Sequence, residues 1–359
     1  MSDYTADTSP RKKPLSLQLD PGMFERATDE EKAQHEVMRE STTFFRDGLR
    51  RLSRNPLSML SIATLLLLLI TIFVAPLIVP YKYSEVIKVD GQRDRTTANL
   101  RPMTYSVLEQ EKVDAGEKVF PHIFGTDELG RDYFIRVIYG ARVSLAVGFF
   151  ASIIVLVIGL LYGSVSGYVG GRTDIIMMRI VDIIYSLPDT LMVVMLSVVL
   201  DQVLGDSLKG TILASLGNNM ISMFVVFGLL YWVGMARLVR GQILAIKNNE
   251  YVLAAKALGG NARRIILKHI LPNCISVIFI ATALQIPSAI FVESFLSFIG
   301  LGVQAPMPSL GSLANLARGG MQIYPYKMLF PALGICLIVL SFNLLGDGLR
   351  DAFDPRLRR

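Results

Sequence analysis

The side chains that most often carry chemistry are few and scattered in this sequence of 359 residues. His35, His122 and His269 lie far apart, so local sequence assembles neither a metal cluster nor a Ser-His-Asp site. We expect each histidine to be a solvated or interfacial side chain. The Gly-x-x-x-x-Gly-Lys-Ser/Thr phosphate loop is absent, as is any Gly-Lys dipeptide. The sequence therefore predicts no catalytic site, no metal site and no ATP binding by this polypeptide.

Charged residues inside long apolar runs are a second source of chemistry. A charge in hydrocarbon is costly, so it needs a partner or water. Arg179 and Asp182 are three residues apart, and we expect them to pair on one helix face. Asp189 and Glu293 have no obvious partner nearby in the sequence. These two acids are therefore candidates to line a water-filled path or to pair with a second subunit.

The stretch GTDELGRD, from Gly125 to Asp132, is rich in turn residues and charges. It precedes an apolar run, which predicts a structured turn at a membrane surface that leads into a helix. Asp132 and Arg136 are four residues apart and are spaced to pair once that helix begins.

The elements that must position these residues are membrane helices. Hydrophobic residues make up 52% of the chain and charged residues 18%, and the apolar residues come in long runs. Because a helical span needs about 20 apolar residues, five charge-free windows qualify: Leu57–Val79, Val143–Gly171, Thr211–Ala236, Ile270–Val292 and Met328–Gly346. A sixth window, Ile175–Leu200, is long enough but contains Arg179, Asp182 and Asp189. We expect an all-α membrane protein with six transmembrane helices.

Basic residues beside the ends of these windows indicate the orientation. Arg46, Arg50, Arg51 and Arg54 precede the first window, so the N-terminus is expected in the cytoplasm. On a six-span count the basic loop 237–272 and the C-terminal tail also fall on the cytoplasmic side. The same rule explains the net charge of +6 without a nucleic-acid partner.

This alternation divides the chain into regions. We expect a flexible cytoplasmic tail over residues 1–42. Residues 43–56 follow as an interfacial helix, for which a plain orientation signal is an equal alternative. The first span, 57–79, leads to an extracytoplasmic segment, 80–142. The core, 143–349, holds the other five spans and the loop 237–272, and a cytoplasmic tail, 350–359, ends the chain.

Glycines recur every four residues in the second span, at Gly159, Gly163, Gly167 and Gly171. They leave one helix face without side chains, so a neighbouring helix can approach closely. We favour a packing face over glycines that the membrane merely tolerates.

Residues 250–273 have the features of a helical hairpin facing water. Asn249 is a good N-cap and Glu250 places a negative charge in the first turn. The i, i+3, i+4 and i+7 positions of this helix are Tyr251, Ala254, Ala255 and Leu258. Gly259 and Gly260 end it, and Asn261 caps a second helix, Ala262–Ile270. By composition alone, an ordinary basic loop is as good an interpretation.

The order Ala254-Ala255, three residues, Gly259, and then Leu271-Pro272 resembles the cytoplasmic EAA loop of ABC importer permeases. In that pattern a Glu precedes the two alanines and an Ile stands two residues before Leu-Pro. Here Leu253 and His269 replace them. The resemblance implies a coupling helix that contacts an ATPase through Glu250, Tyr251, Ala254, Ala255, Leu258, Gly259, Gly260, Leu271 and Pro272.

Longer stretches, in order, resemble the peptide/nickel permeases, specifically the second subunit of oligopeptide and dipeptide importers. They include FGTDELGRDYFIRVIYGARVSLAVG (Phe124–Gly148), RNPLSMLSIATLLLLLITIFVAPLI, ESFLSFIGLGVQAPMPSLGSL and GDGLRDAFDPRLRR. The resemblance covers roughly Phe44 to the end. It implies the type I ABC importer permease fold, with an outer mouth shaped by Gly125, Thr126, Asp127, Gly130, Arg131 and Asp132.

The resemblance also implies a function and partners. The chain is expected to carry oligopeptides or dipeptides by alternating access across the bacterial cytoplasmic membrane, amid membrane lipid. A homologous permease would form a heterodimer with it, two cytoplasmic ATPases would bind ATP and Mg, and an extracytoplasmic protein would deliver peptide. The alternatives are a permease of the same fold for nickel or another small solute, a self-contained channel or ion-coupled carrier, and a membrane enzyme.

Overall fold

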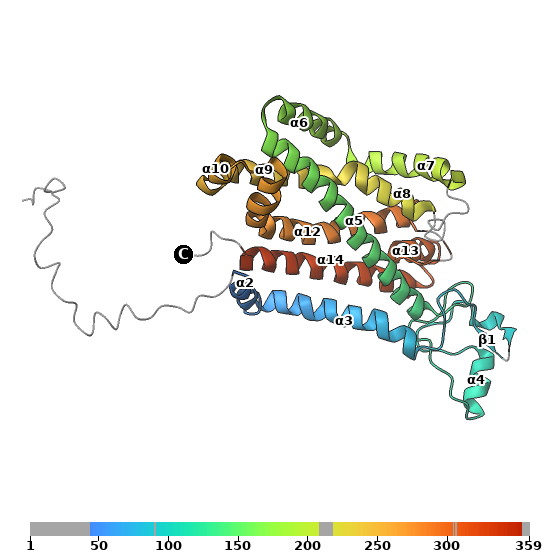
Figure 1. Ribbon diagram of the computed structural model, residues 1–359. Helices are drawn as coiled ribbons and strands as arrows, with labels where there is room; N and C mark the ends of the chain where they lie inside the picture. The colour runs from blue at the N-terminus through green and yellow to red at the C-terminus, as the bar shows by residue number, and fades with distance from the viewer. Residues whose placement is uncertain (1–43, 90, 208–217, 304, 306, 354–359) are drawn as a thin grey trace, which may run out of the picture. The chain divides into compact units, whose positions relative to one another are not determined.

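The computed structural model describes residues 44–89, 91–207, 218–303, 305 and 307–353 (Figure 1). The tail expected over residues 1–42 lies outside them, as do residues 354–359 of the expected C-terminal tail. Part of the window Thr211–Ala236 is also outside the described residues.

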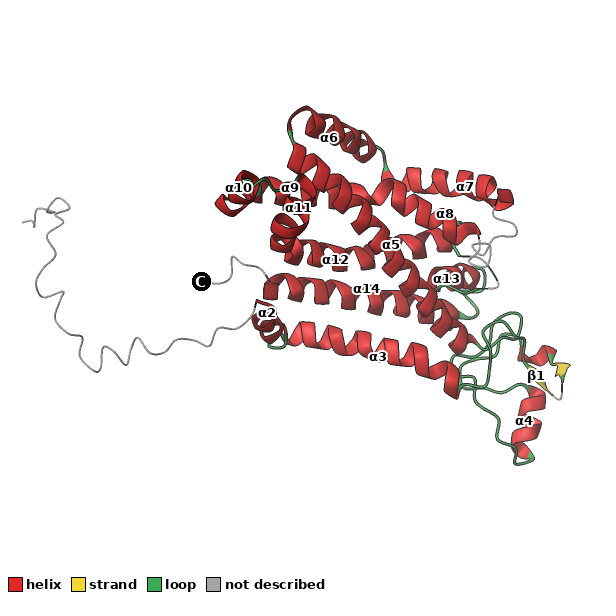
Figure 2. Cartoon of the chain, in the orientation of Figure 1, coloured by secondary structure: helices red, strands yellow, loops and turns green. Residues whose placement is uncertain are grey.

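Helices dominate the described residues (Figure 2). Five are long and apolar enough to cross a membrane: α3 (Pro56–Ile78), α5 (Tyr133–Val169), Met220–Ile246, Ala262–Phe298 and α14 (Pro325–Phe353). A sixth span exists if α6 (Gly171–Ser186) and α7 (Asp189–Ser207), which are bent by 91° at their junction, count as one. The chain is therefore a multi-pass all-α membrane protein with five to six spans among its described residues, as the apolar windows predict.

The span boundaries differ from the windows because caps, not charge-free runs, end helices. Asp132 accepts a hydrogen bond from the Ile135 amide at 2.9 Å, so α5 begins at Tyr133, ten residues before the window Val143–Gly171. Two of the five runs are composite. Met220–Ile246 joins most of α8 (Asn218–Val226), the π-helix η4 (Phe227–Tyr231) and α9 (Trp232–Ile246), while Ala262–Phe298 joins α11 (Ala262–Ile265), the π-helix η5 (Ile266–Ile270) and α12 (Leu271–Phe298).

The remaining elements are short. They are α2 (Phe44–Leu52), β1 (Lys88–Val89), β2 (Gln92–Arg93), the 3-10 helix η2 (Arg95–Thr97), α4 (Val107–Asp114), α10 (Glu250–Ala257) and α13 (Leu310–Arg318). The two strands are antiparallel, with Lys88 opposite Arg93 and Val89 opposite Gln92. Helix α2 forms within the stretch expected to be an interfacial helix. We call the two ends of the bundle the α4 end and the α10 end.

Helix α5 runs through the bundle and packs against α9, α12, α3, α13 and α14 (Figure 1). Helix α14 in turn packs against α12 and α3. Three buried apolar clusters lie along α5, centred on Ile138 toward the α4 end, Val147 in the middle and Val155 toward the α10 end. The hydrophobic core therefore follows this one helix.

The glycine face of α5 lies against α9. A Cβ atom on Gly159 would lie 2.6 Å from the Met235 Cβ, and one on Gly163 would lie 2.5 Å from the Ala236 carbonyl oxygen. A Cβ on Gly167 would come within 3.1 Å of the Arg240 carbonyl oxygen. We call these contacts the glycine seam. Gly171 differs, because it begins α6 with a φ of +57° and has no atom within 4 Å of a Cβ position.

Replacing Gly163 by alanine should destabilise the bundle, because the added methyl group cannot fit without moving α9. We expect a loss of about 1–3 kcal/mol, the usual cost of overpacking. The matched control is Gly241→Ala on α9, where the Cβ position has no atom within 4 Å. Thermal unfolding of the purified variants in detergent measures both. Equal midpoints for the two variants would show that the seam tolerates separation.

Candidate functional site

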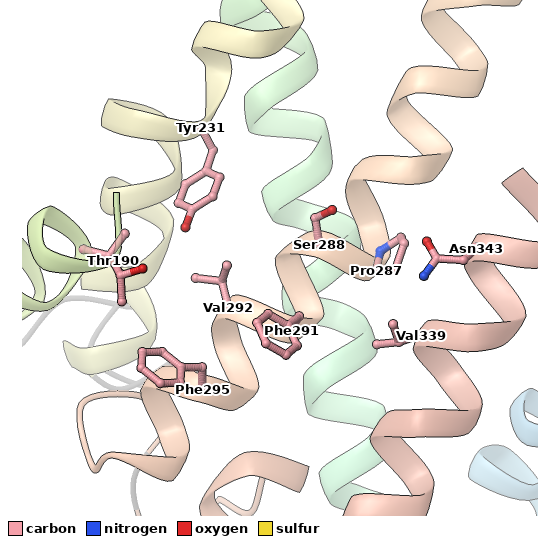
Figure 3. Close-up of a pocket in the computed structure, with 10 residues that line it drawn as sticks. Thr190, Tyr231, Pro287, Ser288, Phe291, Val292, Phe295, Val339 and Asn343 are labelled. Carbon is pink, nitrogen blue, oxygen red and sulfur yellow. The ribbon is translucent and has the colours of Figure 1, made fainter. Parts of the chain in front are cut away.

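A hollow of about 370 Å³ lies between α7, η4, α12 and α14 (Figure 3). Its wall is open on one side, since the Phe291 side chain is 62% exposed. The lining residues are Thr190, Val193, Tyr231, Pro287, Ser288, Phe291, Val292, Phe295, Val339 and Asn343. Elements that are far apart in the sequence therefore build one concave surface along α12.

A second hollow, of about 590 Å³, adjoins the first and shares Tyr231 and Ser288 with it. Its other lining residues come from the α6–α7 junction, from η4 and α9, and from α12: Ile184, Tyr185, Leu187, Pro188, Met192, Leu230, Val233, Gly234 and Gln285. Because Tyr231 and Ser288 line both hollows, we treat the two together as one surface of α12 and its neighbours. We call it the α12 depression.

Two departures from regular α-helix shape this depression. Tyr231 closes the π-helix η4, and π-helical turns are rare and frequently found at functional sites. Pro287 lies inside α12, where it removes a backbone donor. Helices broken in this way are tolerated in membranes where they are buried in protein or line a cavity.

The described lining residues of the α12 depression are uncharged. Hydroxyl and amide groups come from Thr190, Tyr231, Gln285, Ser288 and Asn343, and aromatic faces from Phe291 and Phe295 among others. Such groups can exchange hydrogen bonds with an amide backbone and contact apolar side chains. They do not favour one sign of charge. Sequence reasoning missed them because it searched apolar runs for charges; Pro287 and its polar neighbours were the available signal.

Of the two acids expected to line a path, neither is placed in the depression by a described side chain. Asp189 begins α7, between two lining residues, but its side chain lies outside the described residues. Glu293 is fully buried instead of facing water. Its carboxylate accepts hydrogen bonds from the hydroxyls of Ser144 and Ser297 at 2.7 Å and Ser294 at 3.2 Å. Serines solvate this acid where the sequence led us to expect water or a second subunit.

The Glu293 serines also hold α13 in place. The Ser144 hydroxyl accepts a hydrogen bond from the Leu310 amide at 3.3 Å, and the Ser297 hydroxyl accepts one from Val303 at 3.0 Å. Gly311 lies so close to α12 that a Cβ would be 2.3 Å from the Ser294 carbonyl oxygen. One buried carboxylate therefore organises α5, α12 and α13.

At the α4 end, the GTDELGRD stretch forms a tightly bonded turn. The Asp127 carboxylate accepts hydrogen bonds from the amides of Leu129 and Arg131, both at 2.9 Å, and pairs with the Arg131 side chain at 2.7 Å. Gly125 and Gly130 have positive φ angles of 74° and 75°. Both lie so close to the segment 97–101 that a side chain would not fit. The Thr126 hydroxyl bonds the Thr97 carbonyl.

Asp132 does not pair with Arg136, contrary to the four-residue spacing. Its carboxylate caps α5 and binds the Nδ1 atom of His122 at 2.9 Å, while Arg136 lies 3.4 Å from Asp127. The Nε2 atom of His122 lies 3.1 Å from the Glu109 carboxylate on α4. His122 is therefore fully buried between two acids, and the expectation of a solvated or interfacial histidine is wrong here.

Each nitrogen of the His122 imidazole faces a carboxylate, an arrangement that favours the doubly protonated, charged ring. Burial alone would lower the pKa of His122, but hydrogen bonds to Asp132 and Glu109 outweigh burial and raise it to about 9. Burial likewise opposes the charge on Glu109, yet the His122 hydrogen bond and the Ser106 amide keep its pKa below the usual range. This buried pairing ties α4 to the start of α5.

Near the α10 end, ion pairs join α6 to α9. The Arg240 guanidinium makes two bonds to the Asp174 carboxylate, at 2.5 and 2.6 Å. Asp182 pairs with Arg237 at 2.7 Å and not, as the sequence suggested, with Arg179. Bidentate pairing gives α6 a fixed position against α9.

The predicted hairpin, residues 250–273, follows α9 in the chain. Helix α10 begins after Asn249 and ends before Leu258, and Gly259 has a φ of +81°. Asn261 caps α11 through a 2.8 Å bond from the Arg264 amide, as predicted. Val252 is buried, whereas Tyr251, Leu253 and Leu258 are 41%, 49% and 89% exposed. Leu271 and Pro272 begin α12, and the unmatched His269 lies in η5.

Comparison with known proteins gives consistent matches. Residues 156–359 match the family described as binding-protein-dependent transport system inner membrane component, and residues 43–102 match the N-terminal TM domain of oligopeptide transport permease C. The oligopeptide transport system permease protein OppC of Bacillus subtilis is 37% identical over 337 residues, covering 94% of this chain and 98% of that protein. The dipeptide transport system permease protein DppC of the same organism is 44% identical over 324 residues, covering 90% and 89%. OppC of Haemophilus influenzae is 37% identical over 323 residues, covering 90% and 92%.

The His122 pairing predicts a pH dependence of stability. Because the folded-state pKa of about 9 exceeds the ordinary 6.5, its contribution is complete below pH 6.5 and is lost as the pH rises through 9. The contribution is on the order of 3 kcal/mol. Thermal unfolding between pH 6 and 9.5 should therefore show a falling midpoint for the wild type. His122→Gln should lower the unfolding midpoint at pH 6 and weaken the dependence of the midpoint on pH. His269→Gln, in η5, is the control and should leave the pH dependence of the wild type unchanged.

Proposed function

The chain belongs to the family of inner membrane components of binding-protein-dependent transport systems, and from that membership we propose how it works in an importer of oligopeptides or dipeptides. Its relatives across nearly the whole chain are named as oligopeptide and dipeptide permeases, which favours peptide over nickel as the transported solute. The family is a transport permease and not an enzyme. The chain is thus the membrane-spanning subunit through which peptide moves.

The partners follow from the same proposal. A homologous permease pairs with this chain, two cytoplasmic ATPases bind ATP and Mg, and an extracytoplasmic protein delivers the peptide. The clusters of arginine beside α3 and in the loop 237–272 support the proposal that the α10 end lies in the cytoplasm of a bacterial cell. The α4 end then faces outward, and the GTDELGRD turn shapes the outer mouth.

The observation that carries the proposal is the exposed apolar surface of α10. Tyr251 and Leu253 on this short helix and Leu258 at its C-cap are exposed beyond the ends of the spans, and exposed apolar groups of this kind mark interaction sites. Leu253 occupies the position where the EAA pattern has Glu. Docking onto the ATPase therefore uses an apolar contact at this position, while Glu250 supplies a charge one turn earlier.

Movement of α10 is transmitted through its buried side. Val252 belongs to one apolar cluster with Val155 of α5, Val239 of α9 and Cys274 of α12. The Lys247 ammonium, at the end of α9, donates a 2.9 Å hydrogen bond to the Gly167 carbonyl of α5. Together with the glycine seam and the Arg240–Asp174 pair, these contacts make α9, α10 and the adjoining part of α5 one mechanical unit.

Peptide moves along the α12 depression in this proposal. The depression is open on one side, where the second permease completes the path. Neutral hydrogen-bonding groups pair with the peptide backbone, and aromatic faces contact side chains of any type. ATP binding draws the two α10 helices together and opens the path outward, and hydrolysis returns it to the inward side.

Gly259→Val should abolish uptake of a labelled dipeptide. A β-branched residue at a φ of +81° is strained by about 1–3 kcal/mol, which shifts the turn that orients α10. Peptide-stimulated ATP hydrolysis by the purified complex should fall in parallel, while the amount of protein in the membrane stays unchanged.

Gly319→Val is the control for this substitution, because Gly319 has an ordinary φ of −65° and no atom within 4 Å of a Cβ position. Normal uptake by Gly259→Val would remove the coupling role from the hairpin. Loss of uptake with both variants would point to a general folding defect.

Ser288→Trp should reduce peptide uptake at least about tenfold, since the indole fills both parts of the α12 depression. Thr64→Trp on α3 is the matched control: both hydroxyls bond the carbonyl four residues earlier, to Leu284 and Leu60. Uptake of labelled dipeptide, oligopeptide and Ni²⁺ by cells carrying each variant gives the readout. The peptide proposal would be contradicted if wild-type cells took up Ni²⁺ but no peptide and Ser288→Trp abolished the Ni²⁺ uptake. The substrate would then be nickel.

A further inference from the structure

An apolar groove of about 640 Å³ runs along α5 on a side that the α12 depression does not use. It lies between α5, α8 and the segment before α13. The lining residues are Tyr83, Tyr139, Arg142, Val143, Ala146, Val147, Phe150, Ile153, Ile154, Met220, Phe224, Met307 and Pro308. Ala146 is exposed and Phe150 is 55% exposed, so the groove opens away from the protein core.

The polar groups of the groove gather at one end. The rings of Tyr83 and Tyr139 contact each other there, with centroids 4.5 Å apart and planes tilted by 33°, and Arg142 lies one turn further along α5. The Arg142 guanidinium also lies over the Phe73 ring at 5.6 Å. From Val143 to Ile154 the lining side chains of α5 are all apolar. The groove is therefore amphipathic along its length.

This polarity matches the membrane in depth. Arg142 immediately precedes the apolar window of α5, and Tyr83 follows the end of α3, which places both near a membrane surface. Ile154 follows Arg142 by twelve residues along α5, a rise of about 18 Å. Half of the hydrocarbon core is about 15 Å. The apolar part of the groove is thus as long as one leaflet is deep.

The positive charge of Arg142 at the polar end of the groove favours an anionic ligand. Within the part of the chain that the structure describes, Arg142 makes no ion pair with a carboxylate. A phosphate group could accept hydrogen bonds from its guanidinium, with the two tyrosines beside it. A helix seated in the groove would instead bury this arginine against apolar side chains, at a cost that lipid binding avoids.

We propose that this groove is a binding site for a glycerophospholipid of the leaflet at the α4 end, with the phosphate at Arg142 and an acyl chain along α5 to Ile154. The proposal depends only on insertion of the chain in a membrane and not on what it transports. The occupant holds Tyr83, α5 and α8 together, and so the lipid acts as a structural ligand of the permease.

The test measures lipid retained by the assembled transporter complex. Complexes are reconstituted in nanodiscs of phosphatidylglycerol or phosphatidylcholine, extracted with mild detergent, and analysed by native mass spectrometry. Wild type and Arg142→Lys should retain a phospholipid that Arg142→Gln loses. Ala146→Trp, which fills the groove, should lose it as well. The control Arg172→Gln, at the start of α6, should retain it.

Retention from both nanodisc types identifies the phosphate as the recognised group, and retention from phosphatidylglycerol alone identifies an anionic headgroup. Equal lipid retention by wild type, Arg142→Gln and Ala146→Trp would overturn the proposal. So would a cross-link from the variant Ala146→Cys to the second permease, because the groove would then be occupied by protein.

Discussion

Backbone contact between α5 and α9 is the constraint on which the other contacts depend. Two helices touch at this distance only where one of them lacks side chains, and Gly159, Gly163 and Gly167 supply that face. With α9 fixed there, Arg240 meets Asp174 and Lys247 reaches the Gly167 carbonyl. The lengths of these side chains would not bridge a wider gap. The lack of side chains at these three glycines thus determines which polar groups lie within bonding distance of each other.

Helix α5 is cross-linked by polar groups at three levels. At its start Asp132 holds His122, in its first half Ser144 holds Glu293, and near its end Ser166 and Arg240 hold Asp174. Each group is satisfied by partners from other elements, which is how buried polar atoms are usually accommodated. The Tyr133 hydroxyl adds a 2.6 Å bond to the Lys327 carbonyl of α14. The apolar clusters between these levels bury apolar surface, and the polar contacts fix the positions of the helices relative to one another.

Local patterns in the sequence predicted local structure well. The apolar windows locate the spans, and Asn261 and Gly259 define the hairpin, because caps and turns depend on residues close in the sequence. Partners across the fold were not predictable. Asp132 and Asp182 each had a suitable neighbour three or four residues away, yet each binds a residue from another element. Glu293 had no charged neighbour in the sequence that indicated a partner. Its partners are serines, and a serine within an apolar run does not stand out as a charged residue does.

The two π-helices bracket everything between Trp232 and Ile265. Both η4 and η5 accommodate an extra residue in a wider turn, and such turns mark places where a helix bends or changes register. The enclosed block contains α9, α10, α11 and the half of the glycine seam that faces α5. In the proposed coupling, this block moves as a lever and its two ends bend at the π-helices, so that α8 and α12 need not tilt by the same angle.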